Sequence, residues 1–444
     1  MSKLFSFLFG KPLPSHDSPF LSGREKRKVL SRSYTGQYIC HDGFLKPDAS
    51  PHCAVIAPSG GGKTSAFILN SLFTLPKDIS CIVLDAGGDI FRTTKGHLAR
   101  QGFLIKLLDL DDPKAGLKYN PLHRAEPYDV SISRLATILI EANGKGQGDP
   151  FWNQSAIMFL ELMLNALLAK NQQERPKNLT SLFEMVNIYG TSEQPSLDAF
   201  VLKNLSEKSQ LEYLSFVEAT SEKVRASIIS VAKASLSKVT TLGELTENES
   251  LFFEEARSKP CVIFIKARED LIGSTYSFLL SCLYSQLFTF LMELPSEGKP
   301  YLPIRVMADE FSSYKIPQFE TLITVLRRRL VFVSIILQNV SQLQVYGQHE
   351  ADTILANCSS LLIFPGVGDS TAERISRMLG NYEKDGKQLP VMSPREIRML
   401  SKGKALFVHS NLKPMIVRVK GWYQIPRFKK LAFLDQDKKE GGVS

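Results

Sequence analysis

One segment of the sequence restricts the possible folds more than any other. It runs Ala57-Pro-Ser-Gly-Gly-Gly-Lys63-Thr64, and it stands between an apolar run typical of a buried strand, Cys53–Ala57, and a predicted helix, Ser65–Phe73. A glycine-rich turn between a strand and a helix, closed by Lys-Thr, is the pattern of a phosphate-binding loop. Glycines let backbone N–H groups turn inward around an anion, and the N-terminus of the following helix favours negative charge. The segment therefore predicts a site for nucleotide phosphates.

The same segment suggests roles for individual side chains. Lys63 is expected to reach the β- and γ-phosphate oxygens, and the Thr64 hydroxyl is expected to bind Mg²⁺. The loop begins with Ala57 where the pattern has Gly, which is tolerable because the flexibility of the loop lies at residues 60–62. The predicted contacts to ATP come from Pro58, Ser59, Gly60, Gly61, Gly62, Lys63, Thr64 and Ser65.

An acidic pair supplies the second half of the predicted site. Asp309 and Glu310 directly follow the apolar run Ile304–Ala308, which is predicted to be a strand. At a strand end beside a phosphate loop, one acid can hold the Mg²⁺ shell and the next can orient the attacking water. We therefore expect Asp309 to be a metal ligand and Glu310 to be catalytic. In isolation, such a pair would be read as an ordinary solvated turn.

Three further positions are candidates with open alternatives. Gln338 follows the predicted strand Val331–Leu337 and could sense the γ-phosphate or align water, or only cap the strand. Arg327, the first of three arginines before that strand, could act across a subunit interface as an arginine finger. The arginines could instead contact DNA phosphates or form a solvated basic face. Asp85 ends the predicted strand Ser80–Asp85 and could approach the nucleotide or only shape the turn.

Apolar runs of strand length alternate with helical patterns over most of the chain. The predicted strands are Cys53–Ala57, Ser80–Asp85, Phe103–Asp109, Cys261–Ile265, Ile304–Ala308, Val331–Leu337, Ser360–Phe364 and Ala405–His409. The helices predicted among the later strands are Tyr276–Met292, Gln318–Arg328 and Thr371–Leu379. This alternation implies parallel strands joined by crossover helices. The predicted fold class is α/β, with a layered, mainly parallel sheet.

One long stretch has a different texture. Helical spacing dominates there, as in Ala156–Ala169 and Lys223–Lys238, and strand-like runs are nearly absent. We interpret the stretch as an inserted all-α domain. The predicted organisation is an N-terminal extension (1–50), an α/β domain (51–128 and 257–428), the helical insertion (129–256) and a disordered tail (429–444).

Composition narrows the class of partner and the compartment. The 444 residues carry a net charge of +9, so nucleic acid or an anionic membrane face becomes a plausible partner. The six cysteines form no CxxC pair and no Cys/His cluster, which indicates reduced core thiols rather than disulfides or zinc. The apolar start Leu4–Phe9 is too short for a signal peptide or a membrane span. We expect a cytoplasmic protein with at most peripheral contact at the cytoplasmic face of the inner membrane.

The phosphate loop and the acidic pair stand in an ordered series of stretches that resembles the TraG/TraD-type coupling proteins of type IV secretion and conjugation, over roughly residues 52–425. The other stretches are Val83-Leu-Asp85 with Gly88-Asp89, Tyr119-Asn-Pro-Leu122, Asp149-Pro-Phe-Trp-Asn153, Asp309-Glu-Phe311, Leu326-Arg327, Leu337-Gln338, Ser341-Gln-Leu343, Tyr346-Gly347, Asn357-Cys358, Asp369, Thr371-Ala-Glu373, Ser376, Gly380, Glu396-Ile-Arg398 and Leu400. A phosphate loop alone would indicate only a superfamily, whereas this series is highly specific.

The resemblance implies a RecA-like P-loop NTPase domain interrupted by an all-helical domain, in a hexameric ring with ATP at the subunit interfaces. Family members deliver a relaxase-bound DNA strand, or protein effectors, to a secretion channel. The implied partners are therefore DNA without strong sequence preference, a relaxase or effector, the channel components and further copies of the chain. The implied activity is a DNA-stimulated ATPase, and the residues that match the family's positions for it are Lys63, Thr64, Asp309, Glu310, Gln338 and Arg327.

The sequence also departs from the family pattern. Family members typically begin with two membrane-spanning helices, which this sequence lacks, and usually carry a lysine in the turn where this chain has Gly87. Two other interpretations stay open. One is a DNA translocase of the FtsK/HerA type, against which the Asp149–Asn153 stretch and the helical insertion argue. The other is a docking adaptor, in which ATP binding only organises an assembly.

Overall fold

The computed structural model describes residues 19–21, 25–27, 30–31, 37–41, 43–45, 52–141, 150–293, 301–410 and 412–434. At its centre is a nine-stranded sheet with the order β14-β13-β10-β4-β9-β8-β5-β7-β6. The strands are β4 Cys53–Ile56, β5 Ser80–Ala86, β6 Leu104–Asp109, β7 Cys261–Ala267, β8 Ile304–Ala308, β9 Val331–Leu337, β10 Ser360–Ile363, β13 Lys404–His409 and β14 Met415–Arg418. Every strand predicted from the sequence is present, and β14 is an additional one.

The sheet is mainly parallel, as the alternation of strands and helices predicted. All neighbouring pairs from β10 through β6 are parallel. Only β13 breaks the pattern, because it pairs antiparallel with both β10 and β14. The carboxyl ends of β4, β9 and β8 therefore lie side by side at one edge of the sheet, with β9 in the middle. This is the edge at which open α/β sheets bind ligands.

Both faces of the sheet are covered. Val55 of β4 lies in one buried cluster and the adjacent Ile56 in another, because successive side chains of a strand point to opposite faces. The helices over the Val55 face are α3 (Leu69–Phe73), α4 (Asp89–Arg100) and α19 (Pro426–Leu431). The helices over the Ile56 face are α13 (Glu269–Ile272), α14 (Ser277–Leu291), α15 (Phe319–Leu326), α16 (Gln348–Asn357) and α17 (Asp369–Leu379). Burial on both faces explains why the strands read as continuous apolar runs.

A small antiparallel sheet precedes β4 in the chain. Its strands are β1 (Leu30–Ser31), β2 (Gln37–Cys40) and β3 (Gly43–Leu45), in the order β1-β3-β2. It packs on the Val55 face, where Tyr38 accepts a 3.1 Å hydrogen bond from Asn70 and lies edge-on to Phe428 of α19. The predicted extension thus contains strands that cover the main sheet. The apolar start Leu4–Phe9 lies outside the described residues.

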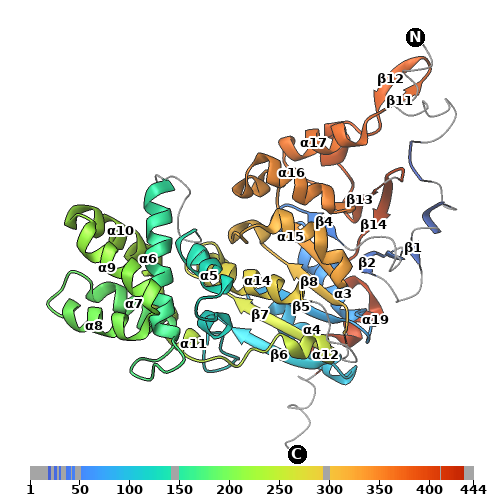
Figure 1. Ribbon diagram of the computed structural model, residues 1–444. Coiled ribbons are helices and arrows are strands. Elements are labelled where there is room, and N and C mark those ends of the chain that lie inside the picture. The colour runs from blue at the N-terminus through green and yellow to red at the C-terminus, as the bar shows by residue number, and fades with distance from the viewer. Residues whose placement is uncertain are drawn as a thin grey trace, which may run out of the picture.

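Between β6 and β7 the described chain forms helices and no strand. They are the short turn η2 (Pro121–Arg124), α5 (Val130–Glu141), α6 (Pro150–Leu168), α7 (Leu179–Ile188), α8 (Gln194–Asn204), α9 (Glu207–Leu214), the π-helical turn η3 (Ser215–Ala219), α10 (Glu222–Leu236), α11 (Val239–Thr246) and α12 (Glu254–Ser258). Figure 1 shows α6 to α10 as a bundle beside the sheet rather than on either of its faces. The helices predicted at Ala156–Ala169 and Lys223–Lys238 correspond to α6 and α10.

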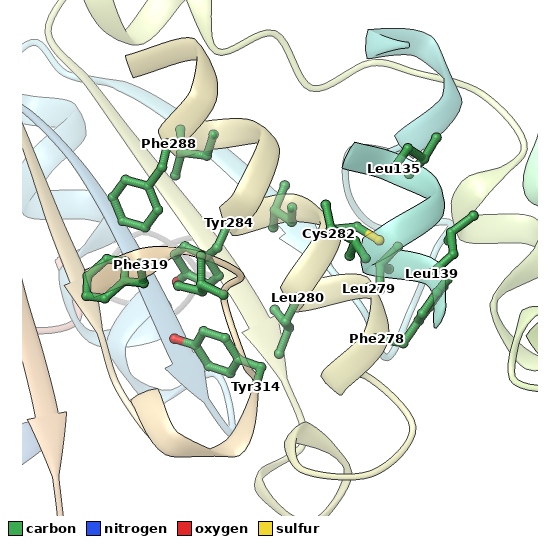
Figure 2. Packing of buried hydrophobic residues seen from close by; sticks show 14 of the residues in the cluster. Leu135, Leu139, Phe278, Leu279, Leu280, Cys282, Tyr284, Phe288, Tyr314 and Phe319 are labelled. Atoms are coloured by element: carbon green, nitrogen blue, oxygen red, sulfur yellow. The ribbon is translucent and has the colours of Figure 1, made fainter. Parts of the chain in front are cut away.

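A continuous hydrophobic cluster joins this bundle to the sheet through α5 and α14. In Figure 2, Leu135 and Leu139 of α5 lie next to Cys282 of α14. Tyr284 of α14 stacks on Tyr314, with 5.0 Å between the ring centroids. Each of these side chains is at most 1% exposed, and such burial stabilises a fold by roughly 1.5–3 kcal/mol per large apolar side chain. Helix α14 is therefore covered by the sheet on one side and by α5 on the other.

The C-terminal part completes one end of the sheet. After α17 come the hairpin β11 (Asn381–Lys384) and β12 (Lys387–Pro390), then α18 (Pro394–Arg398), and Figure 1 shows the hairpin projecting from the body. Helix α19 runs to Leu431, past the predicted start of a disordered tail at residue 429, and residues 435–444 lie outside the described residues. All six cysteines are buried and free, as predicted. None of the helices in the described part of the chain combines the length and apolar character needed to cross a membrane.

Candidate active site

The glycine-rich turn after β4 adopts a conformation that depends on its glycines. Gly60 and Gly62 have φ of +69° and +91°, a region that disfavours residues with a side chain. Gly61 donates a 2.9 Å hydrogen bond to the Pro58 carbonyl, and a Cβ at Gly61 would lie 2.8 Å from that oxygen. The three glycines therefore allow a tight turn that no bulkier residues would form.

The helix after the turn is anchored in the core. It begins with a π-helical turn, η1 (Thr64–Ile68), and continues as α3, with Phe67 and Leu72 fully buried. The Ala66 N–H donates to Gly62 at 2.7 Å, which joins the turn to the first helical residues. Lys63, Thr64 and Ser65 remain partly exposed at the N-terminus, where free backbone N–H groups favour an anion.

The acidic pair after β8 lies directly against this turn. Lys63 Nζ forms an ion pair with Glu310 Oε1 and lies 3.5 Å from Asp309 Oδ1. Asp309 and Glu310 are only 3% and 9% exposed. Glu310 has φ of +47°, an uncommon backbone conformation for a residue other than glycine, and such strain gathers at functional sites. Segments almost 250 residues apart in sequence thus meet within one buried ion-pair cluster.

Gln338 completes the cluster. It directly follows β9, the strand between β4 and β8. Its side-chain amide donates to Glu310, with Nε2 at 3.2 Å from Oε2 and 3.4 Å from Oε1. The Glu310 carboxylate is therefore held from one side by Lys63 and from the other by Gln338. An amide and a carboxylate so placed can position a water molecule and withdraw its proton.

Burial and neighbouring charges shift the pKa values of the cluster in opposite directions. Burial raises the pKa of Asp309 to about 6, with Lys63 lowering it and the Glu310 charge raising it further. Burial would lower the pKa of Lys63, but the Asp309 and Glu310 carboxylates outweigh burial and raise it. Lys63 therefore stays charged between the two acids, whereas burial disfavours the ionised form of Asp309.

The oxygen atoms that this site offers fit a magnesium ion only if phosphate oxygens take part. Among the described residues, no group of three or more His, Cys, Asp or Glu side chains could hold a metal. Thr64 offers a hydroxyl and Asp309 a carboxylate, both hard oxygen ligands. Mg²⁺ is commonly bound by one or two carboxylates together with substrate phosphates and water. The residues present fit that arrangement.

Arg327 does not join the site of its own chain. It begins the short turn η5 (Arg327–Arg329) before the amino end of β9, whereas the cluster lies at the carboxyl ends of the strands. Its side chain is exposed, and its charge acts on His52 at the amino end of β4. Burial and Arg327 together lower the pKa of His52 to about 4. Within one subunit, Arg327 and the acidic pair occupy opposite edges of the sheet.

Asp85 has a structural role in the described chain. Its two carboxylate oxygens accept hydrogen bonds from Ile90 N (3.0 Å) and Phe91 N (2.7 Å), which caps the start of α4. This geometry favours the turn-shaping alternative. Burial raises the pKa of Asp85, and the backbone hydrogen bonds from Phe91 and Ile90 act in the opposite direction.

The sequence did not single out the residues that hold the end of β9. Gln342 Oε1 accepts from the backbone N–H groups of Gln338 (2.8 Å) and Asn339 (3.2 Å). Thr371, on α17, hydrogen-bonds to Asn339 from another part of the chain. Gln342 and Thr371 lie in stretches that carried the family resemblance, but the sequence offered no signal for their contacts.

Comparisons with known proteins point to one family. The chain matches the family described as "Type IV secretory system Conjugative DNA transfer" over residues 18–439. No curated protein sequence matches it. The structure is similar to the plasmid coupling protein TrwB in complex with the GTP analogue GDPNP, at 22% identity and a TM-score of 0.72, covering 90% of this chain and 92% of that one.

Two further structures are similar. TrwB with ADP and Mg²⁺ has 21% identity and a TM-score of 0.73, covering 90% of this chain and 93% of that one. VirB4 of Thermoanaerobacter pseudethanolicus has 13% identity and a TM-score of 0.50, covering 87% and 96%. These likenesses show the fold, an α/β, RecA-like P-loop NTPase fold. Because the family match spans nearly the whole sequence, the chain belongs to the type IV secretory system conjugative DNA transfer family, the family of the coupling proteins.

Proposed function

We propose that this chain is an ATP-hydrolysing coupling protein that recruits relaxase-bound DNA, or a protein substrate, and moves it to a type IV secretion channel. One observation carries the proposal. Lys63, Asp309, Glu310 and Gln338 converge on one buried cluster at the carboxyl edge of the sheet, in a chain of the conjugative DNA transfer family. The nucleotide complexes of TrwB support ATP and Mg²⁺ as the ligands.

Nucleotide binding would rearrange the charges of the cluster. In the described structure Lys63 is paired with Glu310. A triphosphate in the glycine-rich turn would compete for the lysine with several negative oxygens and would leave Glu310 free to act on water. Thr64 and Asp309 would hold Mg²⁺ together with the phosphates, and the ion would neutralise charge at the transferring phosphoryl group.

Once released from Lys63, Glu310 would still be held by Gln338. The amide donates to the carboxylate, so it fixes the direction in which Glu310 can accept a proton from water. Glu310 is almost fully buried, and in such a site a fixed carboxylate acts more strongly than in water. We assign Glu310 the role of orienting and deprotonating the attacking water, and Gln338 that of aligning it.

We further propose that the arginine comes from a neighbouring subunit of a homo-hexamer. Arg327 is exposed at the sheet edge opposite its own cluster, so only another copy of the chain could bring it to the phosphates. An arginine supplied in this way stabilises the charge of the transition state. The net charge of +9 supports DNA as a second partner, bound through phosphates with little sequence preference. The site of action would be the cytoplasm at the inner-membrane face.

The helical region offers a surface for a protein substrate, a relaxase or an effector. A groove of about 320 Å³ lies between α6, η3 and α10, lined by Phe159, Phe216 and Val224. At its rim Phe151 and Met158 are 55% and 59% exposed. Large apolar side chains around a groove are typical of protein-binding surfaces.

The test is the ATPase rate of the purified protein with Mg-ATP, with and without single-stranded DNA. We expect DNA to stimulate the rate, Lys63→Ala to abolish nucleotide binding, and Glu310→Gln to bind ATP without turning it over. Wild-type turnover in Glu310→Gln would remove Glu310 from its assigned role. The wild-type protein could instead bind a substrate protein but hydrolyse little ATP, with that binding intact in Lys63→Ala. This result would favour the docking-adaptor interpretation. The family match already favours the secretion role over an FtsK/HerA-type translocase.

A further inference from the structure

The end of β9 is held by hydrogen bonds of three side chains that lie outside the ion-pair cluster. We call Asn339, Gln342 and Thr371 the β9 bracket. Gln342 Oε1 accepts from two consecutive backbone N–H groups, those of Gln338 at 2.8 Å and Asn339 at 3.2 Å. The bond to Gln338 N fixes the backbone from which the Gln338 side chain projects. The direction of that side chain thus depends on Gln342.

Thr371 closes the bracket from α17. Its hydroxyl donates to Asn339 Oδ1 at 2.8 Å and accepts from Val340 N at 3.2 Å, so both functions of the hydroxyl are used. Thr371 is only 1% exposed. A hydroxyl at this position is therefore needed to satisfy two polar groups at the start of η6 (Val340–Tyr346).

The bracket is continuous with the ion-pair cluster. From Thr371 the hydrogen bonds run through Asn339 and the backbone to Gln338, and from Gln338 Nε2 to the Glu310 carboxylate at 3.2 Å. Small shifts matter at the end of this chain of contacts. A displacement of about 1 Å in a group that orients a reactant can lower the rate by about 100-fold.

We propose that Gln342 and Thr371 are positioning residues for ATP hydrolysis: the β9 bracket holds Gln338 against Glu310 and thereby sets the turnover rate without contributing to nucleotide affinity. The inference rests on the proposed ATPase function and deepens it. Because Thr371 lies on α17, this helix is also part of the support for the catalytic residues. Helix α17 is tied to the segment after β12 by the hydrogen bond from Ser376 Oγ to Met392 O, at 2.6 Å.

The test uses matched pairs of variants in the full-length protein. Thr371→Val keeps the shape of the side chain but removes the hydroxyl, whereas Thr371→Ser keeps the hydroxyl. Gln342→Met removes the acceptor oxygen, whereas Gln342→Glu keeps one. The measurements are kcat and KM for Mg-ATP, the Kd for ADP, and the melting temperature. We expect Thr371→Val and Gln342→Met to lower kcat about tenfold or more, with the Kd for ADP within about twofold of wild type and the Ser and Glu variants near wild type.

A double-mutant cycle separates positioning from general loosening. If the bracket acts through Gln338, then Thr371→Val in a Gln338→Ala background has little further effect on kcat. Wild-type kcat in both Thr371→Val and Gln342→Met would overturn the inference, as would effects that multiply with Gln338→Ala. If Thr371→Val does not fold, the Gln342 pair decides. A wild-type protein without ATPase activity would instead refute the proposed function.

Discussion

The ionised Asp309 carboxylate should lower the free energy of unfolding of the ligand-free protein, and the Asp309→Asn variant tests this. Asp309 is 3% exposed, and burial raises its pKa from 3.8 to about 6. Each pKa unit corresponds to about 1.4 kcal/mol, so keeping the folded carboxylate ionised at neutral pH costs up to about 3 kcal/mol. Asparagine has the same shape, can still accept from Glu310 N, and carries no charge.

The effect should depend on pH with a defined sign. Because the pKa of Asp309 is higher in the folded protein than in the unfolded chain, the folded state binds the proton more tightly. The corresponding stability is fully present below about pH 4, is lost as the pH rises through about 6, and does not return above it. Asp309→Asn should therefore raise the free energy of unfolding by up to about 3 kcal/mol near pH 8, and by little near pH 4.

The assay is chemical denaturation followed by circular dichroism at both pH values without nucleotide. Asp78→Asn, at an exposed position before β5, is the matched control and should stay within about 0.5 kcal/mol of wild type. The reasoning is refuted if Asp309→Asn is equal to or less stable than wild type near pH 8, because Lys63 would then favour the ionised carboxylate more than burial opposes it.

Three further experiments have defined outcomes. Gly61→Ala places a Cβ 2.8 Å from the Pro58 carbonyl oxygen, so calorimetry should show nucleotide binding lost while circular dichroism shows the fold retained. Asp85→Ala removes the cap from Ile90 N and Phe91 N and should lower the free energy of unfolding by about 1–2 kcal/mol, measured in urea. The Arg327→Ala and Lys63→Ala variants should each lack ATPase activity alone. Mixed rings should recover part of that activity, because an interface between the two variants can combine an intact nucleotide turn with an intact arginine. If no mixing ratio restores activity, Arg327 does not stabilise the transition state.

The meeting of Lys63 with Asp309 and Glu310 was predictable because parallel strands bring their carboxyl ends to one edge. When a phosphate loop or an acid follows an apolar run, the end of that run can be placed at this edge of the sheet. This holds however far apart two such runs lie in the sequence. The position of Gln338 followed from the same rule. Arg327, which precedes a strand, belongs by that rule to the other edge, away from the nucleotide site of its own chain.

Other contacts depend on loop conformation that periodicity does not encode. Gln342 reaches the Gln338 N–H only because η6 turns back after β9, and Thr371 lies on α17, three elements after η6. Strand β14 was missed because Met415–Arg418 is short and lies at the sheet edge, next to the antiparallel β13. The antiparallel β1–β3 sheet was missed because its strands have at most four residues, too few for a clear alternation.

The two-sided cover of α14 has a consequence for truncation experiments. Removing the helical segment would strip Leu135 and Leu139 from α14 and leave Cys282 and its neighbours in contact with water. The remaining core would be expected to aggregate, and any loss of activity would then reflect damage to the α/β core rather than the loss of a surface that the bundle supplies. Point changes on the outer surface of α6 or α10 are the safer way to test whether the bundle binds a partner.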